Sequence, residues 1–103
     1  MTINEAKHYC GVIAAHYGRH SQEYQAAQEL SELMCLLTRR DDQRDSTYKE
    51  RVTDEIADCE IMLEQIRRLN GIDETEVAEH ISQKIERQLQ RMQAEKERSE
   101  NEP

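Results

Sequence analysis

Residues 28–37 read QELSELMCLL and residues 55–63 read EIADCEIML, and each stretch places a pair of acids beside a row of apolar side chains. On a helix, which turns about 100° per residue, Glu29 and Glu32 fall together on one flank of the apolar face. Leu36 lies between these two acids in angle, so we expect the flank to be partly buried. The centre of the core face is assigned to leucines at helical spacing, namely Leu30, Leu33 and Leu37.

The second stretch repeats this arrangement 26 residues later, with Glu55 in the place of Glu29 and Asp58 in the place of Glu32. If the two helices are antiparallel neighbours, the four carboxylates approach a common centre. Gathered carboxylates repel one another unless a cation is present. Oxygen ligands with no nearby His or Cys suit a hard divalent ion, so the repeat predicts a site for Mg²⁺ or Mn²⁺. The alternative is ordinary surface acids paired with arginines, and the repetition favours the metal site.

The composition predicts an all-α chain. Of its 103 residues, none is Trp or Phe, one is Pro and three are Gly, while helix-favouring residues dominate. With 22 acidic and 14 basic residues the formal charge is -8, which disfavours binding to nucleic acid or to anionic lipid. Three unpaired cysteines and the lack of a signal-peptide pattern favour the cytoplasm. No apolar run approaches the roughly 20 residues that a membrane span needs.

Four amphipathic helices are expected. The first begins after a capping box at Thr2 and Glu5 and ends at Gly18, and the second runs from about Gln22 to Thr38. After a loop at 41–46, Ser46 or Thr47 caps the third helix, which stops at Asn70 and Gly71, and Asp73 with Glu76 opens the fourth. We expect one domain over residues 1–94, built as a small four-helix bundle that dimerisation completes, and a disordered charged tail over 95–103.

The two acidic motifs resemble those of the all-α nucleoside triphosphate pyrophosphohydrolases, the MazG-like group related to dimeric dUTPases and dCTP pyrophosphatases. That family's hallmark, EExxE followed by ExxD, is matched by residues 28–32 (QELSE) and 55–58 (EIAD), within a resemblance that extends from about Ala6 to Met92. The resemblance implies Mg²⁺ ligands at Glu29, Glu32, Glu55 and Asp58. Gln28 departs from the pattern, because the family has a leading Glu there; on the helical wheel Gln28 points away from the acidic flank.

The resemblance also implies a reaction: a nucleoside triphosphate is cleaved between its α and β phosphates, giving a monophosphate and pyrophosphate. Glu29 or Glu32 is then the expected general base. In related enzymes basic residues of the last helix approach the phosphates, which points to Lys84, Arg87 and Arg91 here, although these also fit a solvated face paired with glutamates. Tyr17 and Tyr24 are the aromatic candidates for stacking on the base, and Tyr17 fits the first helix's core equally well.

Other interpretations of the sequence have less support. His16 and His20 have the spacing of a zinc pair, but Gly18 interrupts the helix between them. A di-iron bundle needs Glu-x-x-His twice, and the chain has it once, from Glu5 to His8. The competing hypothesis is a helical dimerisation protein that retains an acidic site without catalysis. The expected function is nucleotide-pool cleaning by a cytoplasmic homodimer or higher homo-oligomer, with no base preference evident.

Overall fold

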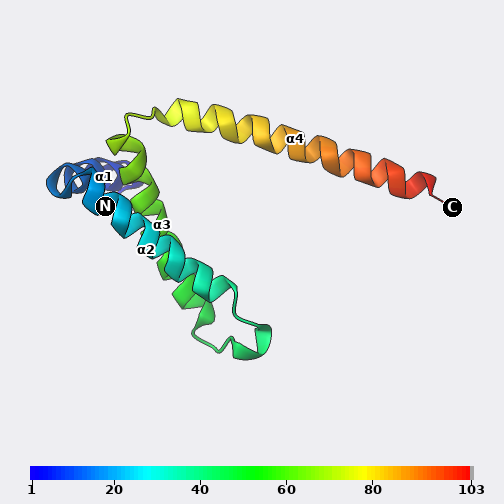
Figure 1. Cartoon of the computed structure of the whole chain (residues 1–103), viewed down its shortest axis with the longest axis horizontal. Helices are drawn as coiled ribbons and strands as arrows, with labels where there is room; N and C mark the ends of the chain where they lie inside the picture. The colour runs from blue at the N-terminus through cyan, green and yellow to red at the C-terminus, as the bar shows by residue number, and fades with distance from the viewer. Residues whose placement is uncertain (103) are drawn as a thin grey trace. The chain divides into compact units, whose positions relative to one another are not determined.

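The computed structural model describes residues 1–102 and is all-α, as predicted. The helices are α1 (Ile3–Tyr17), α2 (Arg19–Leu37), α3 (Tyr48–Leu69) and α4 (Glu74–Asn101), and a short 3₁₀ helix, η1 (Asp41–Gln43), lies between α2 and α3. Figure 1 shows their order along the chain. The chain divides into two compact units, Met1–Gly71 with α1 to α3 and Ile72–Pro103 with α4. The prediction of a single domain over 1–94 remains a prediction.

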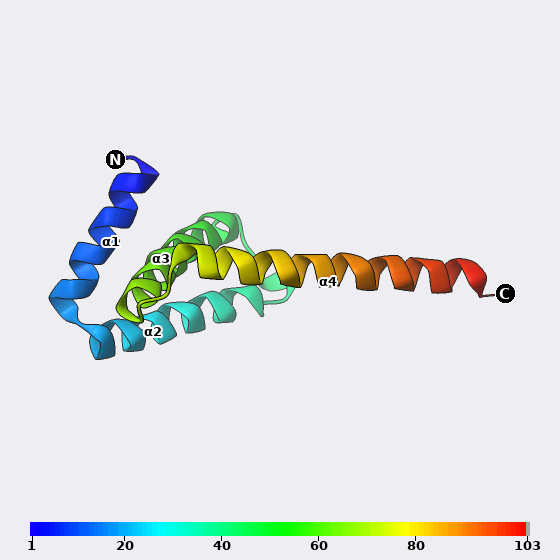
Figure 2. The same cartoon turned by 90° about the horizontal axis from the view of Figure 1, so that it is seen from above.

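The first helix begins and ends where local chemistry requires. The Thr2 hydroxyl accepts a hydrogen bond from the Glu5 backbone N–H at 3.1 Å, so the predicted N-cap is confirmed. Gly18 ends α1 with φ 87° and ψ 166°, a conformation open almost only to glycine. The second helix begins at Arg19 rather than at about Gln22 as predicted, because Gly18 alone makes the turn. Figure 2 shows α1 turning sharply away from α2 at this point.

An antiparallel hairpin of α2 and α3 forms the centre of the first unit (Figures 1 and 2). Arg44 holds the loop between them: its guanidinium donates to the backbone carbonyls of Leu37 at 3.2 Å and Arg39 at 3.1 Å and lies over the Tyr48 ring. Thr47 occupies the N-cap position of α3 but makes no side-chain cap bond, contrary to our prediction. Its hydroxyl instead donates to Asp45 Oδ1 at 2.6 Å, so it bonds within the loop rather than to the first turn of α3.

The buried apolar core of this unit is small, and it consists of Cys10, Ala14, Ala26, Leu36, Cys59 and Met62. The predicted core face of α2 is wrong in part, because Leu30 is 45% and Leu37 is 52% exposed and only Leu33 is half-buried. The face of α2 that meets α3 is rotated toward the acidic flank, where Leu36 is 7% exposed. The flank that we expected to be partly buried is therefore the contact face of the hairpin.

The first helix packs mainly against α3. Arg68 lies so close to Gly11 that a Cβ at that position would approach Arg68 Nη1 to 3.0 Å. Arg67 and Arg68 both donate to the Glu64 carboxylate, at 2.8 and 3.2 Å, and these bonds hold the pKa of Glu64 below its ordinary value. Glu64 is thus paired with arginines, whereas the acids between α2 and α3 form no ion pair within the described residues.

The last helix continues past the end predicted for it. Asp73 caps it, as its side chain accepts from the Thr75 N–H at 3.0 Å, and the helix then runs to Asn101. The helix thus extends through Asn101 into the segment 95–103, for which a disordered tail stays a prediction, and Pro103 lies outside the described residues. Glu, Lys, Arg and Gln extend a helix without apolar packing, and Gln93 supports this segment by donating to Glu97 at 3.0 Å.

None of the helices in the described residues combines the length and the apolar character needed to cross a lipid bilayer.

Candidate metal centre

Carboxylates from α2 and α3 meet at the contact face of the hairpin. One oxygen each from Glu29, Glu32 and Glu55 lies within 4.8 Å of the others. A second group on α3 brings Asp54, Glu55 and Asp58 equally close, so Glu55 belongs to both. The structure thus brings three of the four predicted acids together and places Asp58 beside the shared Glu55. We call these five residues the acidic cluster: Glu29, Glu32, Asp54, Glu55 and Asp58.

The backbone geometry explains this convergence. Glu29 and Leu36 lie near the middle of the α2 face that meets α3, and Glu55 and Met62 lie at the equivalent places on α3. Because α2 and α3 run antiparallel, residue numbers rise along one helix as they fall along the other, and Glu29 lies opposite Glu55. The acids are therefore brought together by the packing of α2 against α3, and not by nearness in sequence.

Two carboxylate oxygens in the cluster lack the partners that burial normally demands. Oε2 of Glu29 and Oε2 of Glu55 are buried, and neither has a hydrogen-bond partner within residues 1–102. Glu29 Oε1 accepts from Gln25 Nε2 at 2.9 Å, which fixes that carboxylate in place. A buried acceptor without a donor costs free energy, and a bound cation or a shared proton would satisfy two such oxygens at once.

The electrostatics of the cluster agree with this geometry. Burial, together with the adjacent carboxyl groups of Glu29 and Glu32, raises the pKa of Glu55 to about 7. Burial and the charges of Glu29 and Asp54 also raise the pKa of Asp58. Within the described residues no cluster acid forms an ion pair, so their mutual repulsion is not relieved by arginine or lysine. The donor set of oxygens alone fits a hard divalent cation.

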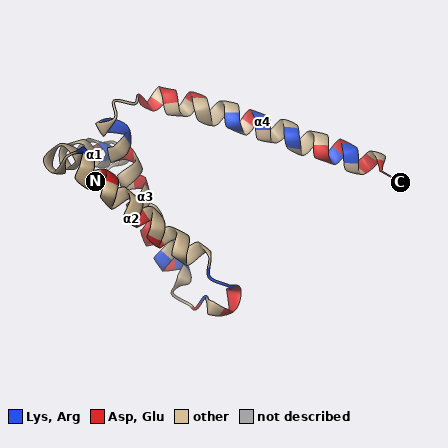
Figure 3. Cartoon of the chain, in the orientation of Figure 1, with Lys and Arg blue, Asp and Glu red and all other residues tan. Residues whose placement is uncertain are grey.

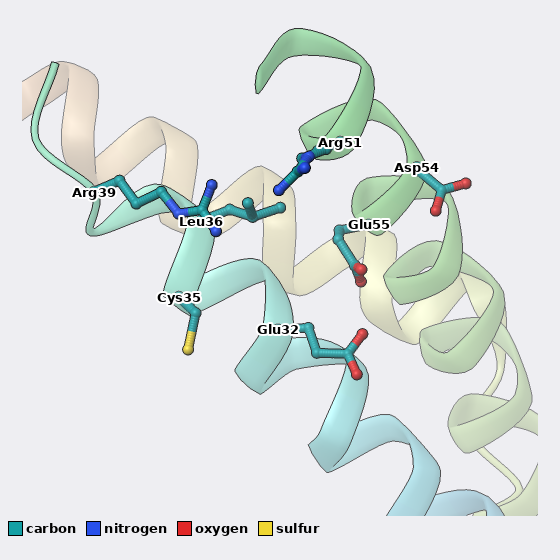
Figure 4. Close-up of a pocket in the computed structure, with 7 residues that line it drawn as sticks. All are labelled: Glu32, Cys35, Leu36, Arg39, Arg51, Asp54 and Glu55. Carbon is teal, nitrogen blue, oxygen red and sulfur yellow. The ribbon is translucent and has the colours of Figure 1, made fainter. Parts of the chain in front are cut away.

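A cavity of about 260 Å³ adjoins the cluster between the C-terminal half of α2 and the N-terminal half of α3. Figure 4 shows the carboxylates of Glu32 and Glu55 at one side of it, and the side chains of Arg39 and Arg51 extending toward each other at the other. Asp54, Cys35 and Leu36 complete the lining. A carboxylate-lined edge and a guanidinium-lined edge thus share one small space.

The remaining predicted residues lie elsewhere on their elements. Gln28 is exposed, as its place on the wheel predicted. Tyr17 and Tyr24 are 60% and 68% exposed, and neither lines the cavity. Lys84, Arg87 and Arg91 are exposed residues of α4, in the second unit. Figure 3 shows that basic residues recur along that helix. The stacking and phosphate-binding roles expected of these residues stay predictions.

Sequence reasoning missed four polar residues at this site: Gln25, Arg39, Arg51 and Asp54. Two of them could have been found from the sequence, because Gln25 precedes Glu29 by four residues and Asp54 precedes Asp58 by four. Residues four apart are neighbours on one side of a helix. No sequence spacing indicated Arg39 and Arg51, since they lie on either side of the loop between α2 and α3.

Together the fold and the site describe an all-α chain with an oxygen-only acidic centre between two antiparallel helices. No protein-family model, curated protein or solved structure matches the chain. The resemblance to the MazG-like group therefore rests on the amino-acid sequence alone.

Proposed function

We propose that this protein is a divalent-metal-dependent nucleoside triphosphate pyrophosphohydrolase of the MazG-like type, with Mg²⁺ as the expected ion and Mn²⁺ as its substitute. The observation that supports this most is the pair of buried, unpartnered oxygens of Glu29 and Glu55 within an acidic cluster. The four acids of the sequence motifs, Glu29, Glu32, Glu55 and Asp58, all belong to the acidic cluster, which also contains Asp54.

The chain's own groups have distinct tasks in this proposal. Glu29, Glu32, Glu55 and Asp58 supply the ligand oxygens, and Asp54 adds a fifth beside them. A bound Mg²⁺ supplies a Lewis acid that neutralises phosphate charge and lowers the pKa of a bound water. Glu29 or Glu32 is the proposed general base; of the two, Glu32 is exposed and lines the cavity, whereas Glu29 is held by Gln25.

A homodimer is the second part of the proposal, and exposed apolar side chains support it. Leu30 and Leu37 on α2 and Ile56 and Leu63 on α3 are each at least 44% exposed. They hold equivalent places on the two antiparallel helices, roughly 90° from the contact face, so they lie on one side of the hairpin. We call these four residues the exposed apolar face. Covering it with a second copy would enlarge a core that contains six apolar residues in one chain.

The fourth helix also exposes apolar side chains that a second copy could cover. Its apolar side chains recur at helical spacing, and all are exposed: Val77, Ile81, Ile85, Leu89 and Met92. A helix of 28 residues with one unburied apolar stripe gains little from propensity alone and is stabilised mainly by packing. The same stripe favours the competing candidate, a helical interaction protein without catalysis.

The test is nucleotide hydrolysis by the full chain with Mg²⁺, measured as pyrophosphate and monophosphate release from a panel of ribo- and deoxyribonucleoside triphosphates. Glu29→Gln and Glu55→Gln should each lower kcat/KM by at least about 100-fold, since even residues outside the ligand shell are worth about 10–100-fold at metal sites. Glu60→Gln is the matched control, because Glu60 is an exposed acid on α3 outside the cluster.

Absence of hydrolysis across the panel, or equal activity in the native chain and both cluster variants, would overturn the enzymatic proposal. The interaction protein would then become the better description.

A further inference from the structure

Arg39 and Arg51 line the cavity but have no assigned role in the metal centre. They also differ from the other arginines of the first unit. Within the described part of the first unit, Arg19, Arg40, Arg44, Arg67 and Arg68 each pair with a carboxylate. Arg39 and Arg51 form no ion pair there, although Glu32, Asp54 and Glu55 line the same cavity.

Their position is set by the hairpin. Arg39 lies two residues past the end of α2, where it is half-buried, and Arg51 lies in the first turn of α3. Closure of the 38–47 loop brings these two positions to the same end of the cavity, and Figure 4 shows both side chains reaching into the space between the helices. Arg39, just past the end of α2, and Arg51, in the first turn of α3, therefore converge at one end of the cavity. Hydrogen bonds from Thr47, and then the charges of both arginines, lower the pKa of Asp45 in the connecting loop.

This arrangement suits an anion that also binds a metal. Guanidinium groups present paired N–H donors that match the oxygens of phosphate groups. Phosphoryl groups are commonly held between carboxylate-bound metal ions on one side and cationic side chains on the other. The cavity offers these two kinds of edge within one small volume.

We propose that Arg39 and Arg51 bind the pyrophosphate portion of a substrate that the acidic cluster engages through its metal. This inference rests on the proposed function, and it assigns phosphate binding to the hairpin itself, in addition to any contribution from α4. A cavity of about 260 Å³ is below the roughly 300–1,000 Å³ of sites that enclose a whole ligand, so it accommodates phosphates rather than the base.

The first experiment measures binding without catalysis. Inorganic pyrophosphate is added to the full chain in the presence of Mg²⁺, and the melting temperature is compared with that in Mg²⁺ alone for the native chain, Arg39→Gln, Arg51→Gln and the double variant. Pyrophosphate should stabilise the native chain, and this shift should be lost in the double variant while the shift caused by Mg²⁺ alone is retained.

Arg40→Gln is the matched control, because it removes an arginine adjacent in sequence that pairs with Asp42 on the surface. It should retain the native response to pyrophosphate. Arg51→Lys separates charge from geometry, since lysine keeps the charge but loses the paired donors, and it should recover only part of the response.

The second experiment is kinetic. Each single glutamine variant should raise KM for a nucleoside triphosphate by roughly 10-fold or more with a smaller change in kcat, as expected for a charged group that holds the phosphate chain. An active native enzyme whose double variant has unchanged KM and unchanged pyrophosphate binding would overturn this inference and leave the proposed function standing.

The converse outcome is also distinct. If no nucleotide is hydrolysed but pyrophosphate still stabilises the native chain and not the double variant, the arginine site stands and the enzymatic proposal fails. If pyrophosphate with Mg²⁺ does not stabilise the native chain at all, the arginine site is refuted.

Discussion

Glu55 is the residue on which the candidate site depends most. It belongs to both carboxylate groups, its Oε2 is buried without a partner in the described residues, and its pKa is raised to about 7. Near neutral pH a metal-free chain therefore divides between a form with a protonated Glu55 and a form with an uncompensated charge. A divalent cation would replace the proton, so metal affinity should increase as pH rises through about 7.

The raised pKa of Glu55 predicts a pH dependence of stability. The folded chain keeps this proton up to about pH 7, whereas the unfolded chain loses it near 4.5. Glu55 therefore lowers stability progressively as pH rises from 4.5 to 7, and the full penalty persists above pH 7. Melting temperatures in EDTA should fall over this range more for the native chain than for Glu55→Gln, and Mg²⁺ should reduce the fall.

Identical melting profiles for the native chain and Glu55→Gln would contradict this assignment. Glu60→Gln provides the comparison, because it removes an exposed acid from the same helix and should leave the slope unchanged.

At the scale of elements, each boundary is set by one or two residues. Thr2 and Asp73 cap helices with their side chains, while Arg44 closes the loop that positions α3 beside α2. Gly18 has the largest effect, because the direction of α1 relative to α2 depends on a single backbone conformation with φ 87° and ψ 166°. No protein atom lies within 4 Å of a Cβ placed there, so the requirement for glycine is conformational and not steric.

Gly18→Ala should therefore destabilise the chain by about 1–3 kcal/mol through backbone strain. Gly71→Ala, at φ 64° with equally open surroundings, should cost about 1–2 kcal/mol. Equilibrium urea unfolding followed by circular dichroism measures both.

Asparagine distinguishes the two glycines, since it tolerates the left-handed helical region but not the conformation of Gly18. Gly71→Asn should recover most of the lost stability, and Gly18→Asn should not. Equal recovery at both positions would show that the turn at Gly18 relaxes without cost.

For the whole molecule, the balance between buried and exposed apolar side chains is unusual. Six apolar residues are buried in the part of the chain that the structure describes, while the exposed apolar face and the apolar side chains of α4 are exposed. A second copy that covers these surfaces is the arrangement we propose. The formal charge of -8 keeps such a chain soluble and would oppose association, so the apolar contact must outweigh that repulsion.

A homodimer predicts a specific response to substitution on the exposed apolar face. Leu63 is 54% exposed in one chain, so Leu63→Lys would cost a monomer little but would bury a charge in a dimer. Sedimentation equilibrium should give twice the chain mass for the native protein and a shift toward the single-chain mass for Leu63→Lys.

Ile3→Lys is the control, because Ile3 is 75% exposed at the start of α1 and lies outside both apolar surfaces. It should leave the dimer intact. A native protein that sediments as a single chain at all concentrations would contradict the dimer.

Local chemistry made much of the fold predictable. The helix caps at Thr2 and Asp73 and the stops at Gly18 and Gly71 follow from side chains and backbone freedom within a few residues. The wrong core face of α2 shows where this reasoning ends: Leu30 and Leu37 form a regular apolar stripe, yet α3 packs beside it against Leu36 and Glu29. Periodicity identifies an apolar stripe but does not say which partner covers it.

The sequence by itself determined that the chain is helical, where most of its helices begin and end, and that Glu29, Glu32, Glu55 and Asp58 occupy equivalent flanks of two helices. These properties depend on neighbours within one or two helical turns. Only the tertiary structure decided that the acids meet at the contact face, with two buried oxygens left unpartnered, and that Arg39 and Arg51 converge beside them. Those features depend on how α2 and α3 are rotated about their axes when they pack, and that rotation is set by contacts between residues distant in sequence.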